Sequence, residues 1–166
     1  MKLAQNRRLL ALALASVSCI ALGDDGHRTQ AQFIGVLTGQ VVGLQADPER
    51  CPNPSLPLRI DVVGTAQTTL GGGQYTQTHC EDVDHTVARQ GVLSVTLADG
   101  TRLFSAYQSN ILPTPTSASD NKFVISGQYH NTGGTGALAR VHGMGITAGM
   151  VDVSTFTVVL ALSGSL

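Results

Sequence analysis

One glycine-rich stretch of this chain, NTGGTGALARVHGMG at positions 131–145, has a spacing that could bind a nucleotide. Its segment GTGALA fits the pattern G-x-G-x-x-A, which in dinucleotide-binding proteins holds a pyrophosphate at the start of a helix. Further glycines at 143, 145 and 149 would each cost such a helix about 1 kcal/mol relative to alanine. The chain also lacks a GxxxxGK(S/T) phosphate loop. We therefore expect no nucleotide cofactor, and we expect Gly133, Gly134 and Gly136 to form a structural turn.

Hydrolytic chemistry has little support in the residue pattern. No G-x-S-x-G nucleophile motif is present, and Glu81, Asp82 and Asp84 fall in a polar segment, 81–90, that we expect to be a surface loop. The remaining polar candidates on or near predicted strands are Tyr75, His79, Tyr107, Tyr129, His130 and His142. Such residues do chemistry only where several converge in one mostly apolar cavity. We assign no catalytic residue and take as ligand-pocket candidates Tyr75, Phe104, Tyr107, Tyr129 and His142.

The N-terminus has the pattern of a secretory signal. A positive region with Lys2 precedes an apolar run, LLALAL from position 9, that is too short to cross a bilayer, which takes about 20 residues. Small residues before position 24 predict a signal peptide over 1–23 and a periplasmic or secreted mature domain over 24–166. The alternative is a lipobox, SVSC, in which Cys19 becomes a lipidated N-terminus. We expect no transmembrane segment in the mature chain.

Charge and cysteine content narrow the partners and the compartment. Removal of residues 1–23 leaves seven basic against eleven acidic side chains, a net charge of −4, with no basic cluster and no tryptophan, so we expect no nucleic-acid partner. The mature chain keeps two cysteines, Cys51 and Cys80, which in an exported protein predict a disulfide closing a loop of about 30 residues, worth about 3–4 kcal/mol. The alternative, a metal site built on His79, Cys80 and His85, matches no common zinc spacing, and we expect no metal.

The elements that must position these residues are strands. Apolar residues alternate with a period of two, and glycine breaks nearly every window of helical length. We expect strands over 32–44, 58–70, 74–80, 122–130 and 154–166, with a glycine turn at 71–73. The segment 91–110 predicts a hairpin with a two-residue Asp99-Gly100 turn, which would place Val95 opposite Phe104 and put both on the core face.

Several of these residues also carry a family resemblance. Gly133-Gly134-Thr135-Gly136 matches a GGTG motif, Leu138-Ala139 stands where Phe-Ala is usual, and Gly143 and Gly145 form the following G-x-G. Upstream, LADGTRLFSAYQ is similar to a hairpin motif of the same group, with Leu103 and Tyr107 in register, and Cys80 follows His79 at a position where that group often carries a cysteine. Over roughly 58–166 the chain resembles the allene oxide cyclase-like and dirigent-like β-barrels of exported bacterial proteins. Arg140 and His142 depart from it, since small residues are usual there.

The sequence thus predicts an all-β fold, a single antiparallel β-barrel of about eight strands without a substantial helix. A barrel of that size is just wide enough for packed side chains or for one small ligand. We expect an exported barrel that binds a hydrophobic small molecule in its lumen without catalysis. One alternative is a cyclase or isomerase that acts on a hydrophobic substrate in the lumen, and another is a structural or envelope module whose lumen is packed. The sequence also leaves open whether the protein associates with a second copy of itself.

Overall fold

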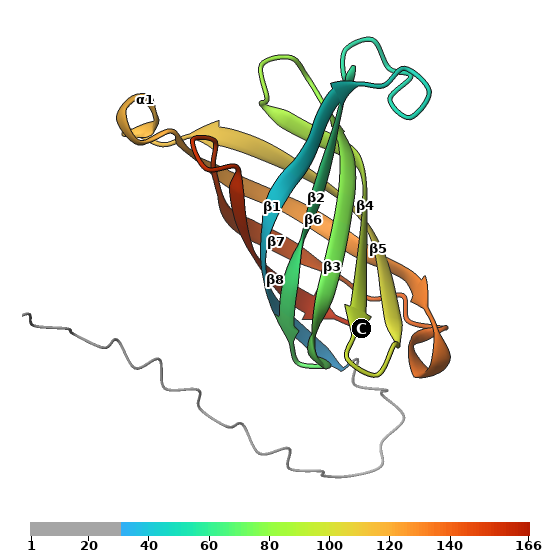
Figure 1. Ribbon diagram of the computed structural model, residues 1–166. Helices are drawn as coiled ribbons and strands as arrows, with labels where there is room; N and C mark the ends of the chain where they lie inside the picture. Colours follow the sequence, from blue (N-terminus) through green and yellow to red (C-terminus); the bar gives the residue numbers. More distant parts are fainter. Residues whose placement is uncertain (1–30) are drawn as a thin grey trace, which may run out of the picture.

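The computed structural model describes residues 31–166, which form a closed antiparallel β-barrel (Figure 1). Each strand pairs with the next along the chain and β8 pairs with β1, so the sheet has no free edge. The predicted all-β barrel of about eight strands is confirmed. The strands are β1 (Gln32–Ala46), β2 (Leu58–Thr68), β3 (Gly71–Glu81), β4 (Val87–Leu97), β5 (Arg102–Pro113), β6 (Lys122–Gly134), β7 (Met144–Asp152) and β8 (Thr157–Ser165).

Helix is confined to two short connections in the described chain, α1 (Ser117–Asp120) and η1 (Gly136–Leu138). No helix within residues 31–166 is long and apolar enough to cross a membrane. The predicted signal peptide over 1–23 and the alternative lipidation site at Cys19 lie outside the described residues.

The strands form because apolar side chains recur at every second position. In β1 buried positions, among them Phe33 and Leu37, alternate with exposed ones. In β8 the buried residues Val158, Leu160 and Leu162 alternate with exposed residues in the same way. All these buried side chains point into the barrel and pack as one core cluster with residues of β2 to β6. Tyr75 belongs to the same cluster, so the lumen is largely filled by side chains near the chain ends.

Strand glycines make room in this narrow lumen for tyrosine rings. A Cβ at Gly39 or Gly64 would collide with the ring or hydroxyl of Tyr75. A Cβ at Gly145 would lie 2.6 Å from the Tyr129 hydroxyl oxygen, in the β7–β8 wall. At these three positions an aromatic ring lies directly against the backbone of a nearby strand, which only glycine permits.

The β4–β5 hairpin differs from the predicted one by a single residue. Its loop contains three residues, 98–100, and Gly100 takes a φ of +84°, as expected when a left-handed residue closes a three-residue loop. The additional loop residue makes Leu103, rather than Phe104, the partner of Val95. Because side chains alternate across a strand, the predicted register is wrong for all of β5: Leu103 points into the lumen and Phe104 points outward.

The glycine-rich stretch connects β6 to β7. Gly133 and Gly136 have positive φ values of +126° and +56°, and a Cβ on Gly134 would lie against the Arg102 carbonyl oxygen. The residues after Gly136 form one 3-10 turn, and β7 follows at Met144. Instead of the βαβ unit of a dinucleotide-binding protein, the stretch forms a tight connection between antiparallel neighbours.

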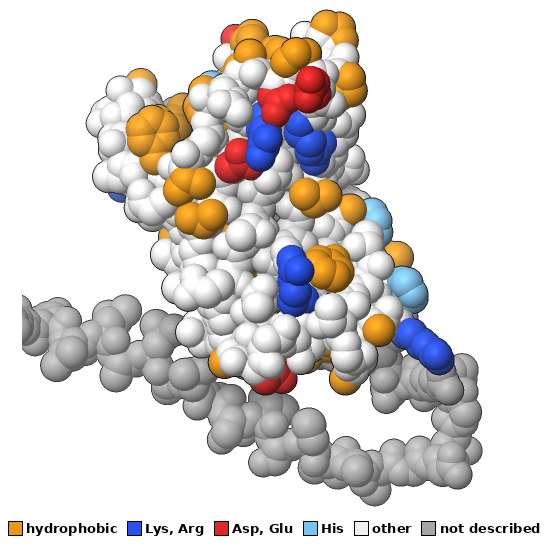
Figure 2. Space-filling view, turned by 45° about the vertical axis from the view of Figure 1, so that its right-hand side comes forward, with side chains coloured by type: hydrophobic (Ala, Val, Ile, Leu, Met, Phe, Trp, Pro, Cys, Tyr) orange, Lys and Arg blue, Asp and Glu red, His pale blue; other side chains and the backbone are white. Residues whose placement is uncertain are grey.

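The two ends of the barrel differ. One end, which we call the mouth, carries the connections 47–57, 82–86, 114–121 and 153–156, while the other three connections and both ends of the described chain lie at the other end (Figure 1). Acidic and basic side chains lie beside one another toward the mouth, above a wall with few charges (Figure 2). Among them, Arg59 forms ion pairs with Asp47 at 3.2 Å and with Asp61 at 2.9 Å.

Candidate functional site

The candidate site begins with the polar residues that β3 places inside the barrel. Gln77, His79 and Glu81 alternate with outward-facing neighbours and are all buried. Glu81 was expected in a surface loop, and that expectation is wrong, because it is the last residue of β3 and faces the lumen near the mouth. Buried polar groups in proteins are almost always hydrogen-bonded, so the partners of these side chains define the site.

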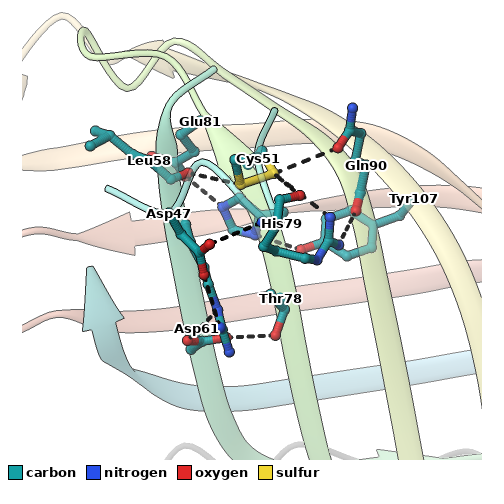
Figure 3. Close-up of a disulfide and its surroundings, with 12 residues drawn as sticks. Asp47, Cys51, Leu58, Asp61, Thr78, His79, Glu81, Gln90 and Tyr107 are labelled. Atoms are coloured by element: carbon teal, nitrogen blue, oxygen red, sulfur yellow. Dashed lines mark hydrogen bonds and ion pairs between the residues drawn. A yellow bond between two sulfur atoms is a disulfide. The ribbon is translucent and has the colours of Figure 1, made fainter. Parts of the chain in front are cut away.

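These side chains form a chain of short hydrogen bonds. The Tyr107 hydroxyl oxygen lies 2.6 Å from Nδ1 of His79, and Nε2 of His79 lies 2.6 Å from Oε1 of Glu81. The second carboxylate oxygen of Glu81 lies 2.6 Å from Nδ1 of His85, whose side chain is 46% exposed. The chain of hydrogen bonds therefore runs from a tyrosine inside the lumen to a histidine in contact with solvent, and Figure 3 shows its inner members, Tyr107, His79 and Glu81.

The partners of His79 determine where its proton lies. An ionised carboxylate only accepts hydrogen bonds, so Nε2 of His79 carries the proton and donates it to Glu81. In the neutral imidazole, Nδ1 is then the acceptor, and the Tyr107 hydroxyl donates to it. Burial raises the pKa of Tyr107 well above its ordinary value, and the charge of Glu81 acts in the same direction, so the phenol keeps its proton at neutral pH.

Tyr107 reaches His79 across a glycine. β4 lies between β3 and β5, and Gly91 is the β4 residue that pairs with Tyr107. A Cβ on Gly91 would lie 2.5 Å from two carbons of the Tyr107 ring, so only glycine lets the ring lie flat over β4. Gly91 follows a register shift in the β4–β5 pairing, a local irregularity of the kind often found beside functional sites.

A disulfide fixes the end of β3, the strand that carries His79 and Glu81. Cys51 and Cys80 are bonded and buried, which confirms the predicted pair (Figure 3). The bridge holds the 47–57 connection against β3, and Arg50 in that connection donates a hydrogen bond to the Gln90 carbonyl oxygen at 2.7 Å. Cys80 lies between His79 and Glu81 in sequence, so the disulfide anchors the backbone between the two residues that share a hydrogen bond.

An apolar cavity adjoins the chain of hydrogen bonds. It has a volume of about 60 Å³, and its polar lining comes from Gln77, His79, Glu81, Tyr107, Ser109, Tyr129 and Thr147. The apolar lining includes Val62, Leu93, Ile125, Leu160 and Leu162. A larger hollow of about 320 Å³ lies at the mouth, and five residues line both spaces: Val41, Ile60, Glu81, Ile111 and Val151. The two spaces together extend from the mouth to the middle of the lumen.

Two hydroxyl groups on residues that line this cavity have no hydrogen-bond partner among residues 31–166. They belong to Tyr129, which is 3% exposed, and to Thr147, which is 4% exposed. Burying a hydroxyl without a partner costs about 1–3 kcal/mol in proteins. Tyr129 is also the direct cross-strand neighbour of Tyr107, so its side chain starts from the same face of the sheet.

The structure separates the five predicted pocket residues. Tyr107 and Tyr129 line the cavity. Tyr75 lies in the packed part of the lumen, where its hydroxyl also lacks a partner among the described residues and burial raises its pKa to about 12. Phe104 lies on the outer face, with the Arg102 guanidinium 4.9 Å from its ring centre, and His142 is exposed in the β6–β7 connection.

Sequence reasoning singled out His79 but missed its partner Glu81 and the cavity residues Gln77 and Thr147. The alternation Gln77-x-His79-x-Glu81, three polar residues on the inward face of one strand, is the signal that would have found two of them. Residues 31–166 contain no group of three potential metal ligands, and Cys80, which the alternative metal site would have used, is bonded to Cys51.

Fold and site place this protein in the class of closed eight-stranded antiparallel barrels with a partly hollow lumen open at one end. Comparison of the chain with protein-family models, with curated proteins and with solved structures finds no match.

Proposed function

We propose that this protein is an exported barrel that binds a small, largely hydrophobic molecule in the part of its lumen nearest the mouth, which we call the upper lumen. The observation that carries the proposal is the pair of buried hydroxyls, on Tyr129 and Thr147, that have no partner among residues 31–166 and belong to the lining of an otherwise apolar cavity. A ligand with one polar oxygen would give one of them a partner while its apolar part fills the space next to the leucine, isoleucine and valine side chains.

The size of the hollow limits the ligand. Binding pockets for small molecules usually measure about 300–1,000 Å³. The mouth hollow, at about 320 Å³, lies at the lower end of that range, and the 60 Å³ cavity extends it toward Tyr107. A compact molecule of one or two rings, or a short branched chain, fits this space, with its polar end toward the cavity.

Two further observations support parts of this proposal. A disulfide is typical of proteins outside the cytosol, which agrees with a signal peptide over 1–23 and with a secreted or periplasmic location. The alternative of a purely structural module explains the packed lumen around Tyr75, but it leaves the hollow space near the mouth without a role. The relationship to allene oxide cyclase-like barrels is part of the same proposal and rests on the glycine motif described above.

The test is a fluorescence titration with 2-naphthol, a compact apolar molecule with one hydroxyl group. We expect saturable binding, and we expect Thr147→Val to weaken it about 3- to 10-fold, the range for loss of one hydrogen bond. Thr132→Val, the same substitution on the exposed outer face of β6, is the matched control and should leave affinity unchanged. Native mass spectrometry of protein purified from its own host should show a retained small molecule. Absence of both saturable binding and a retained ligand would refute the proposal.

A further inference from the structure

We infer that the upper lumen is a proton-transfer site, with Tyr107 as its acid–base group and a hydrophobic ketone bearing acidic C–H groups beside the carbonyl as its substrate. This inference rests on the proposed binding of a small molecule in the lumen. It goes beyond that proposal because it assigns a reaction to the hydrogen-bonded chain of Tyr107, His79, Glu81 and His85, which binding alone does not require.

The order of groups in the chain supports proton movement. A phenol lies beside the apolar cavity, an imidazole follows it, and a buried carboxylate lies behind the imidazole, each contact being 2.6 Å. This is the arrangement in which a reacting hydroxyl passes its proton to a histidine that is oriented by a carboxylate. The Tyr107 hydroxyl donates its single proton to His79, and its oxygen has two acceptor positions, of which the side chain of Gln77 takes one and a ligand proton would take the other.

The reaction step needs no other reactant. A C–H bond beside the ligand carbonyl breaks, and its proton forms a new O–H bond at Tyr107 as the original Tyr107 proton moves to Nδ1 of His79. The electron pair of the broken C–H bond becomes the enolate of the ligand, and the imidazolium is stabilised by Glu81, which accepts its Nε2–H. Reversal returns a proton to the same carbon or to a conjugated one, so the net result is proton exchange or double-bond isomerisation.

The enolate requires hydrogen-bond donors, and Tyr129 and Thr147 are the candidates. Donors that are already in place where negative charge develops are usually the largest single contribution to such catalysis. The unpartnered hydroxyls of Tyr129 and Thr147 belong to residues that line the same cavity as Tyr107. Burial raises the pKa of Tyr129, so it remains a donor at neutral pH.

The chain of hydrogen bonds also connects the cavity to solvent. His85 at its outer end is about half exposed and contacts the second oxygen of Glu81, and both line the mouth hollow. Protons held by the chain therefore exchange with water, and in D₂O the ligand should gain deuterium from it.

The experiment uses 2-indanone, a compact ketone with acidic CH₂ groups, incubated with the mature protein in D₂O and followed by NMR as loss of the CH₂ signal. We expect exchange above the buffer rate that saturates with 2-indanone concentration. Tyr107→Phe should lower the saturated rate by at least about 100-fold, the lower end of the contribution of an acid–base group. Tyr75→Phe removes a buried hydroxyl from a residue that does not line the cavity, and it should leave the rate unchanged.

His79 and Glu81 act through Tyr107 and are positioning residues. Glu81→Gln preserves the shape but removes the carboxylate, so it should lower the saturated exchange rate while 2-indanone still displaces 2-naphthol at the same concentration. A purely structural role for Glu81 would instead change binding and rate together. If 2-indanone displaces 2-naphthol but exchange does not exceed the buffer rate, or Tyr107→Phe exchanges as fast as the native protein, the inference is wrong and the binding proposal stands. If 2-naphthol and 2-indanone both fail to bind and the protein from its own host retains no small molecule, both proposals are wrong.

Discussion

The disulfide allows a stability prediction from the structure. Cys51 and Cys80 are separated by 29 residues, so their bond removes the closure entropy of a loop of that length from the unfolded chain. The chain-entropy relation gives about 3.6 kcal/mol at 25 °C for this length. For a domain of about 140 residues, a loss of that size corresponds to a fall of about 12 °C in Tm.

The measurement compares the mature protein with a Cys51→Ala/Cys80→Ala double variant by urea unfolding and by thermal melting. Both sulfurs lie in a small buried cluster with Leu56, so the double variant also loses some packing, which adds to the entropic effect. The native protein in a reducing agent keeps both side chains and is the matched control, and it should show most of the same loss. A difference below about 1 kcal/mol in both experiments would refute the entropic reasoning, because it would mean that the unfolded chain is already restrained without the bond.

Three other outcomes follow from single positions. Gly91→Ala should destabilise the barrel by about 1–3 kcal/mol in urea, because the new methyl group overlaps the Tyr107 ring; an unchanged midpoint would show that the ring has room to move. Gly100→Val should lower the free energy of unfolding by more than about 1 kcal/mol, because a β-branched residue is strained at a φ of +84°, and stability equal to the native protein would exclude that left-handed conformation. The hydrogen bond from the Arg50 amide and the contact with Arg59 lower the pKa of Asp47, so its stabilising effect is complete above the ordinary carboxylate pKa and is lost as pH falls through the lowered value. The urea midpoint should therefore fall less steeply below about pH 4 in Asp47→Asn than in the native protein, and parallel curves would contradict this.

The fold was predictable because the period-two pattern and the density of glycine leave few alternatives to a closed antiparallel sheet. The register of β5 was not, because it depends on whether the Asp99-Gly100 hairpin has two or three loop residues. Both loop lengths are compatible with Asp-Gly, and the choice reverses every side chain of the strand. Phe104 was placed in the pocket for that reason, and it lies outside.

The candidate site was only half predictable. Tyr107, Tyr129 and His79 attracted attention as polar residues on strands, but their convergence depends on contacts between strands. The central hydrogen bond passes over β4, and it exists because Gly91 has no side chain. Glu81 was assigned to a loop because its neighbours Asp82 and Asp84 are acidic, although β3 extends one residue further and turns Glu81 inward. An alternating polar pattern that continues an apolar strand deserves the same weight as the apolar pattern itself.

An even number of antiparallel strands returns the chain to the end of the barrel at which it starts. The backbone N–H of Leu166 donates to the carbonyl oxygen of Ala31 at 2.8 Å, at the end opposite the mouth. A short peptide would therefore join the two, and a circular permutant opened in the 114–121 connection would keep every strand pairing. For the same reason, a surface attached immediately before Ala31 would face the end opposite the mouth.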